Sequence, residues 1–181
     1  MDINEIPTRS SDGNVNVFVE VPKDSQNKYE YDEDLGIIVL DRALHSSVHY
    51  PTDYGFVPRT RGADGEPLDA MVMVDESTFP GCLVEARIIG MLTIQFGSGR
   101  PEQKLLGVPV REPRFAEHED VSDVPGHLLR EIEHFFEVFK DLEGSDIGVV
   151  GWEGAQEAQK LLEESIRAAE ESEEESATTS S

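Results

Sequence analysis

The chain has 181 residues and a formal net charge of −23 at pH 7, because 38 acidic side chains face only 15 basic ones. This acidity argues against nucleic acids and anionic membranes as partners, since both need a basic face on the protein. The length suits one domain with a substantial core, which we expect at residues 1–169. The single cysteine, Cys82, excludes an internal disulfide and a cysteine-rich zinc site.

The two ends of the chain carry further signals. Residues 170–181 contain five acids, no base and no large apolar side chain, so they are predicted to form a disordered acidic tail. The first five residues lack the basic and apolar regions of a secretion signal, and no apolar run approaches the roughly 20 residues of a membrane-spanning helix. These features predict a soluble, cytoplasmic protein.

Short strands are predicted over the first 110 residues. Residues 15–21 alternate with period two, and residues 28–40 indicate a hairpin. The segment 50–58 holds two prolines and is expected to be an ordered loop or an edge strand. Further strands are predicted at 70–74, at 81–94 with a division near Gly90, and at 104–110. Half a dozen short strands favour a barrel or a sandwich.

The remainder of the chain indicates two helices. Asp123 is an N-cap candidate and Pro125 a first-turn proline, followed by an apolar stripe at helical spacing that ends near Gly144. A second helix is predicted from about Gly154 to Ala169. Trp152 precedes it as a core or interface anchor. Strands followed by helices predict an α+β domain that is mainly β.

An acidic turn, Asp64-Gly65-Glu66-Pro67-Leu68-Asp69, precedes the predicted strand at 70–74. Its three carboxylates repel one another, and such hard oxygen ligands suit Mg²⁺ or Mn²⁺. On these residues alone, the turn is either a divalent-metal site or a solvated acidic loop.

The order of several motifs resembles that of the soluble family I inorganic pyrophosphatases. The matching residues and segments are Glu20, 28–30, Asp41-Arg42, 50–55, 64–69, Lys104, 134–140 and 149–153. The resemblance covers roughly residues 6–169. It implies a five-stranded barrel of the oligonucleotide-binding type with two helices packed against it. It also implies Mg²⁺-dependent hydrolysis of pyrophosphate to two phosphates, and a homo-oligomer that in bacterial members is usually a hexamer.

The resemblance also implies roles for individual residues. Asp64 and Asp69 match metal ligands, and Glu102 is expected to complete that set. The phosphate-contacting positions are Lys28, Arg42, Tyr54, Lys104 and Lys140. Glu66 matches the position that contacts the attacking water, and together with Lys28, Arg42 and Tyr54 it makes up the predicted catalytic set. Glu20, Glu30 and Tyr50 match accessory positions.

Four residues depart from the family pattern. Glu66 stands where the family has aspartate. Phe96 or a near neighbour stands where the family has a second aspartate, and a phenyl ring cannot ligate a metal. Glu102 replaces a third aspartate, and Phe139 replaces a tyrosine. Loss of one charged ligand or donor typically costs about two to three powers of ten in rate. We therefore expect a slower enzyme, or one with a changed metal preference such as Mn²⁺.

Three interpretations remain open at this point. The first is an active Mg²⁺-dependent pyrophosphatase. The second is an impaired homologue that binds pyrophosphate or a nucleotide, or serves as a regulatory or structural subunit. The third is an acidic barrel unrelated to phosphate chemistry, which gives no reason for four cations, Lys28, Arg42, Lys104 and Lys140, at matching positions.

Overall fold

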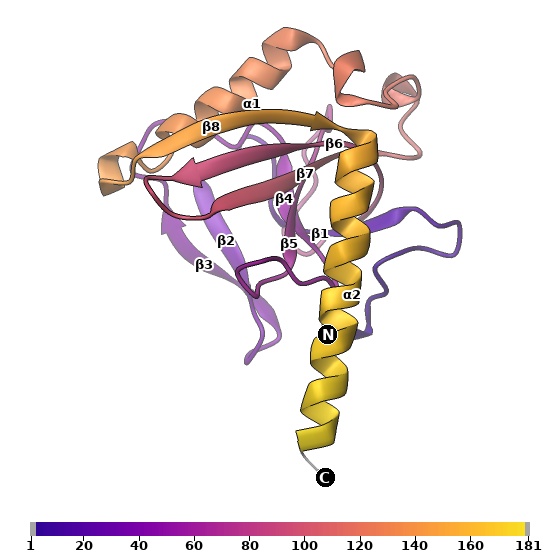
Figure 1. Ribbon diagram of the computed structural model, residues 1–181. Coiled ribbons are helices and arrows are strands. Elements are labelled where there is room, and N and C mark those ends of the chain that lie inside the picture. The colour runs from indigo at the N-terminus through magenta and orange to yellow at the C-terminus, as the bar shows by residue number, and fades with distance from the viewer. Residues whose placement is uncertain (1–2, 180–181) are drawn as a thin grey trace.

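The computed structural model describes residues 3–179, with side chains described for residues 3–175 (Figure 1). The strands are β1 Val15–Val21, β2 Asn27–Asp32, β3 Ile37–Ala43, β4 Asp53–Val57, β5 Leu68–Val72, β6 Leu83–Phe96, β7 Pro101–Pro109 and β8 Ile147–Gly154. The two long helices are α1 Gly126–Val138 and α2 Ala155–Thr179. This architecture confirms the predicted α+β fold that is mainly β.

Five strands close into a ring. The sheet runs β1-β4-β5-β7-β6, and β6 pairs back onto β1, so that Val17 faces Val84. The β5–β7 pairing is parallel and the other pairings in the ring are antiparallel. A closed ring leaves none of its five strands with an unpaired edge. The predicted five-stranded barrel is therefore confirmed.

Strand β4 differs from its prediction as a loop or edge strand. It pairs with β1 on one side and with β5 on the other, so it is an internal strand. Pro51 and Pro58 lie just outside its bounds and remove no hydrogen bond from the sheet. A Cβ atom on Gly55 would lie 1.9 Å from the Phe18 carbonyl oxygen, so only glycine allows β1 and β4 to approach this closely.

Strand β6 is one continuous strand of 14 residues with an irregularity between Ile88 and Gly90, where the sequence predicted a division. It pairs with β1, β7 and β8 along its length. The sequence pattern did not predict β8, a partly exposed strand with three glycines. A Cβ atom on Gly90 would lie 2.8 Å from the Glu153 carbonyl oxygen, so the close β6–β8 pairing depends on this glycine.

The two helices cover different parts of the core. Ile132, Phe135 and Phe136 of α1 belong to one buried cluster, and Ala158 and Leu162 of α2 belong to another. The N-cap of α1 is Pro125 and not Asp123. Asp123 instead accepts hydrogen bonds from the backbone of Glu119 and Asp120 at 3.0 and 2.9 Å, within a preceding 3-10 turn.

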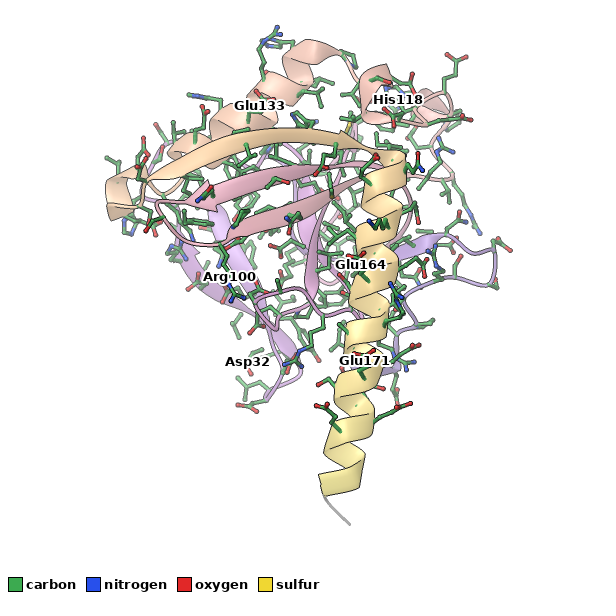
Figure 2. The ribbon with its side chains drawn as sticks, in the orientation of Figure 1. Asp32, Arg100, His118, Glu133, Glu164 and Glu171 are labelled. Atoms are coloured by element: carbon green, nitrogen blue, oxygen red, sulfur yellow. The ribbon has the colours of Figure 1, made fainter. Side chains whose placement is uncertain are left out.

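Glu133 of α1, labelled in Figure 2, accepts a 2.7 Å hydrogen bond from Trp152 Nε1, which anchors β8.

Helix α2 extends beyond its predicted end at residue 169. It continues to Thr179, so residues 170–179 are helical where a disordered tail was expected. Glutamate and alanine have high helix propensity, and an existing helix extends without a new nucleation cost. Arg61 donates a 3.1 Å hydrogen bond to Ser172, and Arg59 lies 3.7 Å from Glu173. Figure 1 shows the last turns projecting away from the barrel. Residues 180 and 181 lie outside the described residues.

Candidate active site

A cavity of about 430 Å³ is lined by strands of the barrel, by β2 and by the end of α1. Eleven of the twelve predicted site residues line it: Glu20, Lys28, Glu30, Tyr50, Tyr54, Asp64, Glu66, Asp69, Glu102, Lys104 and Lys140. They come from β1, β2, β4, β5, β7 and the segments before β4, before β5 and after α1. Arg42 is the exception, since it does not line the cavity. It pairs with Asp41, which in turn contacts the lining residue Lys28.

Lys104 is the most buried charged group of the site, with 4% of its surface exposed. Its Nζ atom lies 2.6 Å from Asp69 Oδ2, 3.4 Å from Glu102 Oε2 and 3.1 Å from the Tyr54 hydroxyl. A buried ammonium is costly unless it is paired, and here two carboxylates pair with it. The parallel β5–β7 register, with Ala70 opposite Leu105, places Asp69 beside Lys104.

Two tyrosines at this end of the cavity remain protonated. Burial raises the pKa of Tyr54 well above its ordinary value, and the charge of Asp69 raises it further. Burial likewise raises the pKa of Tyr50, and the nearby Glu20 and Asp69 carboxylates add to the shift. Both phenols are therefore hydrogen-bond donors at any physiological pH.

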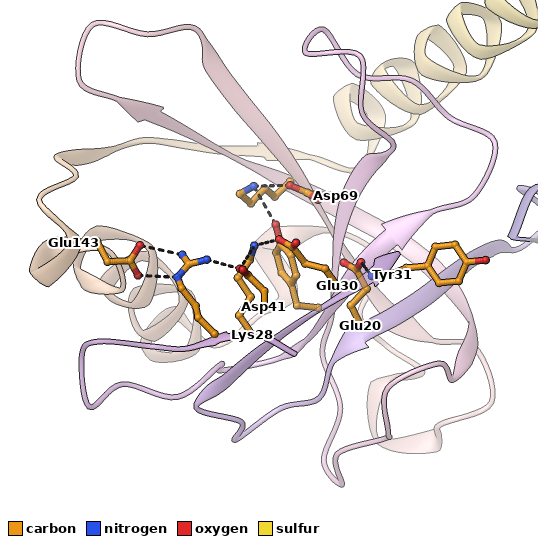
Figure 3. Close-up of polar contacts among 10 residues, drawn as sticks. Glu20, Lys28, Glu30, Tyr31, Asp41, Asp69 and Glu143 are labelled. Carbon is orange, nitrogen blue, oxygen red and sulfur yellow. Dashed lines mark hydrogen bonds and ion pairs between the residues drawn. The ribbon is translucent and has the colours of Figure 1, made fainter. Parts of the chain in front are cut away.

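Glu20 is the one residue of β1 that is not buried, and its side chain faces the cavity. The Tyr31 backbone N–H donates a 2.8 Å hydrogen bond to Glu20 Oε1 (Figure 3). Burial raises the pKa of Glu20 to about 7, and the charges of Asp69 and Glu30 oppose its ionisation further. This carboxyl therefore exchanges a proton near neutral pH.

The hairpin carries a line of alternating charges. Lys28 lies opposite Arg42 in the β2–β3 register, its Nζ pairs with Glu30, and it lies 3.2 Å from Asp41 Oδ2. Asp41 also pairs with Arg42, whose Nε and Nη2 atoms donate to Glu143 Oε1 and Oε2 at 3.1 and 3.0 Å. Figure 3 shows the carboxylates of Glu143, Asp41 and Glu30 along this line.

The predicted metal ligands share one wall of the cavity without converging on one point. Asp69 and Glu102 contact Lys104, and Asp64 Oδ1 accepts a 3.0 Å hydrogen bond from the Glu66 backbone N–H. Across residues 3–175, no three Asp, Glu, His or Cys side chains are grouped closely enough to hold a metal ion. The assignment of Asp64, Asp69 and Glu102 as ligands therefore stays a prediction.

The charge of the cavity nevertheless suits divalent cations. Seven carboxylates line it against three lysines: Glu20, Glu30, Glu33, Asp64, Glu66, Asp69 and Glu102, with Lys28, Lys104 and Lys140. Carboxylate oxygens are the ligands that Mg²⁺ and Mn²⁺ prefer, and an anionic substrate enters such a cavity only with added positive charge. The donor set therefore fits a hard divalent metal.

A family model described as "Inorganic pyrophosphatase" matches residues 17–170. This chain belongs to the inorganic pyrophosphatase family. An inorganic pyrophosphatase of Nostoc sp. is 46% identical over 168 residues, which cover 93% of this chain and 99% of that protein. An inorganic pyrophosphatase of Geobacillus stearothermophilus is 47% identical over 152 residues, covering 84% and 92%. The crystal structure of the inorganic pyrophosphatase from Thermus thermophilus matches with a TM-score of 0.89 and 37% identity, covering 94% of this chain and 99% of that chain.

Membership of the inorganic pyrophosphatase family confirms the resemblance drawn from the motif order, and the family is metal-dependent. The four residues predicted to depart from the family pattern occupy different environments. Glu66 is exposed on its turn, and Glu102 is half-buried against Lys104. Phe96 is half-buried in the cavity wall, and Phe139 is buried with its ring stacked 5.1 Å from that of Phe135.

Sequence reasoning missed two partners of the predicted site residues. Glu143 holds the Arg42 guanidinium, although 101 residues separate them and no local pattern marks the glutamate. The Phe136 ring lies 5.8 Å from Lys104 Nζ, but its position in the apolar stripe of α1 indicated only a core role.

Proposed function

We propose that this chain hydrolyses inorganic pyrophosphate to two phosphates with Mg²⁺ as cofactor. The observation that carries the proposal is the convergence of Asp69, Glu102, Tyr54 and Lys104 in one cavity that also contains Lys28 and Lys140. The names of the family's members support pyrophosphate as the substrate. The carboxylate-rich lining supports a divalent cation.

In this proposal, Asp64, Asp69 and Glu102 hold the metal. The chemistry that a bound Mg²⁺ would supply there is neutralisation of the pyrophosphate charge and a lowered pKa for a bound water molecule. Mn²⁺ is the expected substitute. Lys104 lies between Asp69 and Glu102, so its ammonium both neutralises these carboxylates and faces the space where phosphate oxygens bind.

Cationic and hydroxyl groups position the substrate. Lys28, Lys140 and Arg42 supply positive charge along one side of the cavity, and the protonated Tyr54 donates a hydrogen bond to a phosphate oxygen. Water attacks one phosphorus while the bond from that phosphorus to the bridging oxygen breaks, releasing two phosphates. We assign Glu66 to orient the attacking water and accept its proton. Tyr50, Glu20 and Glu30 are assigned as accessory groups around these residues.

An impaired homologue that binds pyrophosphate without turnover is the second candidate. The observation in its favour is Phe96, an apolar ring in the cavity wall, because the resemblance implies an aspartate at this residue or a near neighbour. A phenyl ring supplies no metal ligand, so a metal site that needs that aspartate is lost.

One set of assays tests both candidates. Purified protein with Mg²⁺, and separately with Mn²⁺, is given pyrophosphate and the released phosphate is measured. The Asp69→Asn variant is expected to lose about two to three powers of ten in kcat, whereas Asp12→Asn, an exposed aspartate outside the cavity, keeps the wild-type rate. Binding of pyrophosphate by calorimetry with neither metal supporting turnover establishes the second candidate instead.

We also propose that the protein is a cytoplasmic homo-oligomer, a hexamer in keeping with the family resemblance. Large apolar side chains are exposed on its surface, among them Leu35, Leu40, Phe79 and Leu142, which a contact with further copies would cover. The unpaired Cys82 suits a reducing compartment. Within residues 3–179, no helix is long and apolar enough to cross a membrane. Light scattering coupled to gel filtration measures the oligomer mass, and a monomeric mass at micromolar concentration contradicts the hexamer.

A further inference from the structure

Lys140 differs from the other two lysines of the cavity, because no carboxylate among the described side chains, residues 3–175, forms an ion pair with it. Lys28 pairs with Glu30 and Asp41, and Lys104 pairs with Asp69 and Glu102. The Nζ atom of Lys140 instead lies over two aromatic rings, 4.9 Å from the centroid of Phe96 and 5.3 Å from that of Phe139. Both distances fall within the range of favourable cation–π contacts.

The surroundings of Lys140 otherwise disfavour its charge. Burial lowers the pKa of Lys140, and the positive charges of Lys28 and Arg42 lower it further. The charges of Glu143 and Glu102 act in the opposite direction and raise this pKa. The negative faces of the two rings contact the ammonium and stabilise its charge.

Phe96 is well placed to fix the Lys140 side chain. It ends β6, a strand of the barrel, and its pairing with Ile147 of β8 holds its backbone in place. Its ring lines the main cavity and also a neighbouring cavity of about 270 Å³. Phe139 is buried in the core and supplies the second ring surface.

We propose that Phe96 is a positioning residue, whose ring holds the Lys140 ammonium towards the pyrophosphate-binding cavity in place of a carboxylate partner. The inference deepens the proposed function and rests on it for the identity of the substrate. A carboxylate partner neutralises a lysine, as Asp69 and Glu102 do for Lys104. A ring orients the ammonium and leaves its full charge available to a phosphate oxygen.

A spectroscopic test of this contact does not depend on turnover. The chain has only five lysines, so each ε-methylene signal is resolvable after isotope labelling of lysine, and the Lys140→Gln variant identifies the Lys140 signal by its loss. Phe96→Leu is expected to remove the upfield ring-current shift of this signal and to lower the pKa of Lys140 further. Phe96→Tyr, which keeps the ring, is expected to retain both. An unchanged Lys140 signal in Phe96→Leu overturns the proposal.

A kinetic test asks whether the contact serves substrate binding. Phe96→Leu is expected to raise the KM for pyrophosphate about threefold to tenfold with a smaller change in kcat, while Phe96→Tyr stays within about twofold of the wild type. Phe115→Leu is the matched control, because Phe115 is also half-buried against the same core cluster and lies outside the cavity lining. Its KM is expected to stay unchanged.

A double-mutant cycle separates positioning from packing. If Phe96 acts through Lys140, then Phe96→Leu has little effect on KM in a Lys140→Gln background. Equal effects of Phe96→Leu in both backgrounds, or equal damage by Phe96→Leu and Phe96→Tyr, overturn the proposal. A wild-type protein without hydrolytic activity contradicts the proposed function alone, and the lysine signals then decide whether Phe96 positions Lys140.

Discussion

Glu143 holds Arg42 in a two-point contact, with Nε to Oε1 at 3.1 Å and Nη2 to Oε2 at 3.0 Å. The pair joins β3 to the turn after α1, and its side chains are 26% and 19% exposed. Such parallel hydrogen bonds orient a guanidinium as well as stabilising it. Arg42, which lies outside the cavity lining, is thus fixed at its edge.

We predict that this partly buried ion pair contributes more to the free energy of unfolding than an exposed ion pair does. Glu143→Gln is expected to lower the free energy of unfolding by about 1–2 kcal/mol, because it removes a charge from a partly buried two-point contact. Asp75→Asn, which breaks the exposed Arg114–Asp75 pair, is expected to cost less than about 0.5 kcal/mol. Urea unfolding measures both, and equal losses contradict the prediction.

Removal of the Lys104 ammonium should increase the effect of a divalent cation on stability. Lys104→Met leaves Asp69 and Glu102 without their partner, and we expect a loss of about 1–3 kcal/mol in metal-free buffer. Added Mg²⁺ should stabilise this variant more than the wild type, because no ammonium competes for the carboxylates. Lys160→Met, at an exposed position of α2, is the control. The same Mg²⁺ effect in all three proteins refutes the predicted metal set.

The raised pKa of Glu20 predicts a pH-dependent stability. Folding raises this pKa from its ordinary value of 4.5 to about 7, chiefly by burial. The protonated carboxyl therefore stabilises the fold below about pH 4.5, and this contribution is lost as the pH rises through about 7. In metal-free buffer at pH 8, Glu20→Gln should exceed the wild type in stability by up to about 3 kcal/mol, with little difference at pH 4.5. Parallel pH profiles for the two proteins contradict the assignment.

Phe139→Tyr tests the departure at the end of α1. The Phe139 ring lines the cavity and lies under Lys140, so a hydroxyl there adds a donor close to the proposed phosphate position. We expect the KM for pyrophosphate to fall by about threefold to tenfold, the size of one hydrogen bond to a charged group. Phe115→Tyr, outside the cavity lining, should leave KM unchanged. An unchanged KM in Phe139→Tyr places its hydroxyl away from the substrate.

Truncation after Ala169 tests whether the last turns of α2 matter to the domain. The Arg59–Glu173 contact is long and exposed, and pairs of this kind contribute little. We expect the truncated protein to keep the wild-type rate of phosphate release and to lose less than about 1 kcal/mol of stability. A larger loss of stability, measured by thermal or urea unfolding, would show that these turns help to stabilise the domain.

Local pattern predicted most strands, and its failures have a common cause. The hairpin at 28–40 and the stripe of α1 follow from side-chain periodicity, which is a property of neighbouring residues. The internal position of β4 and the existence of β8 depend on which strands pair with β1, β5 and β6. Such pairing joins residues far apart in the chain and leaves no local signal. The local prediction therefore relied on the prolines at 51 and 58, which wrongly indicated a loop or an edge strand.

The sequence by itself determined the family, because the order of motifs from Glu20 to Lys140 identifies it without any coordinates, and the same motifs named eleven of the residues that line the cavity. Only the tertiary structure decided how these residues contact one another. It placed Lys104 between Asp69 and Glu102, held Arg42 at the cavity edge through Glu143, and brought Phe96 under Lys140. Contacts of this kind depend on barrel closure and on the packing of α1, which bring distant segments together. The charge and pKa of each group are set by those neighbours.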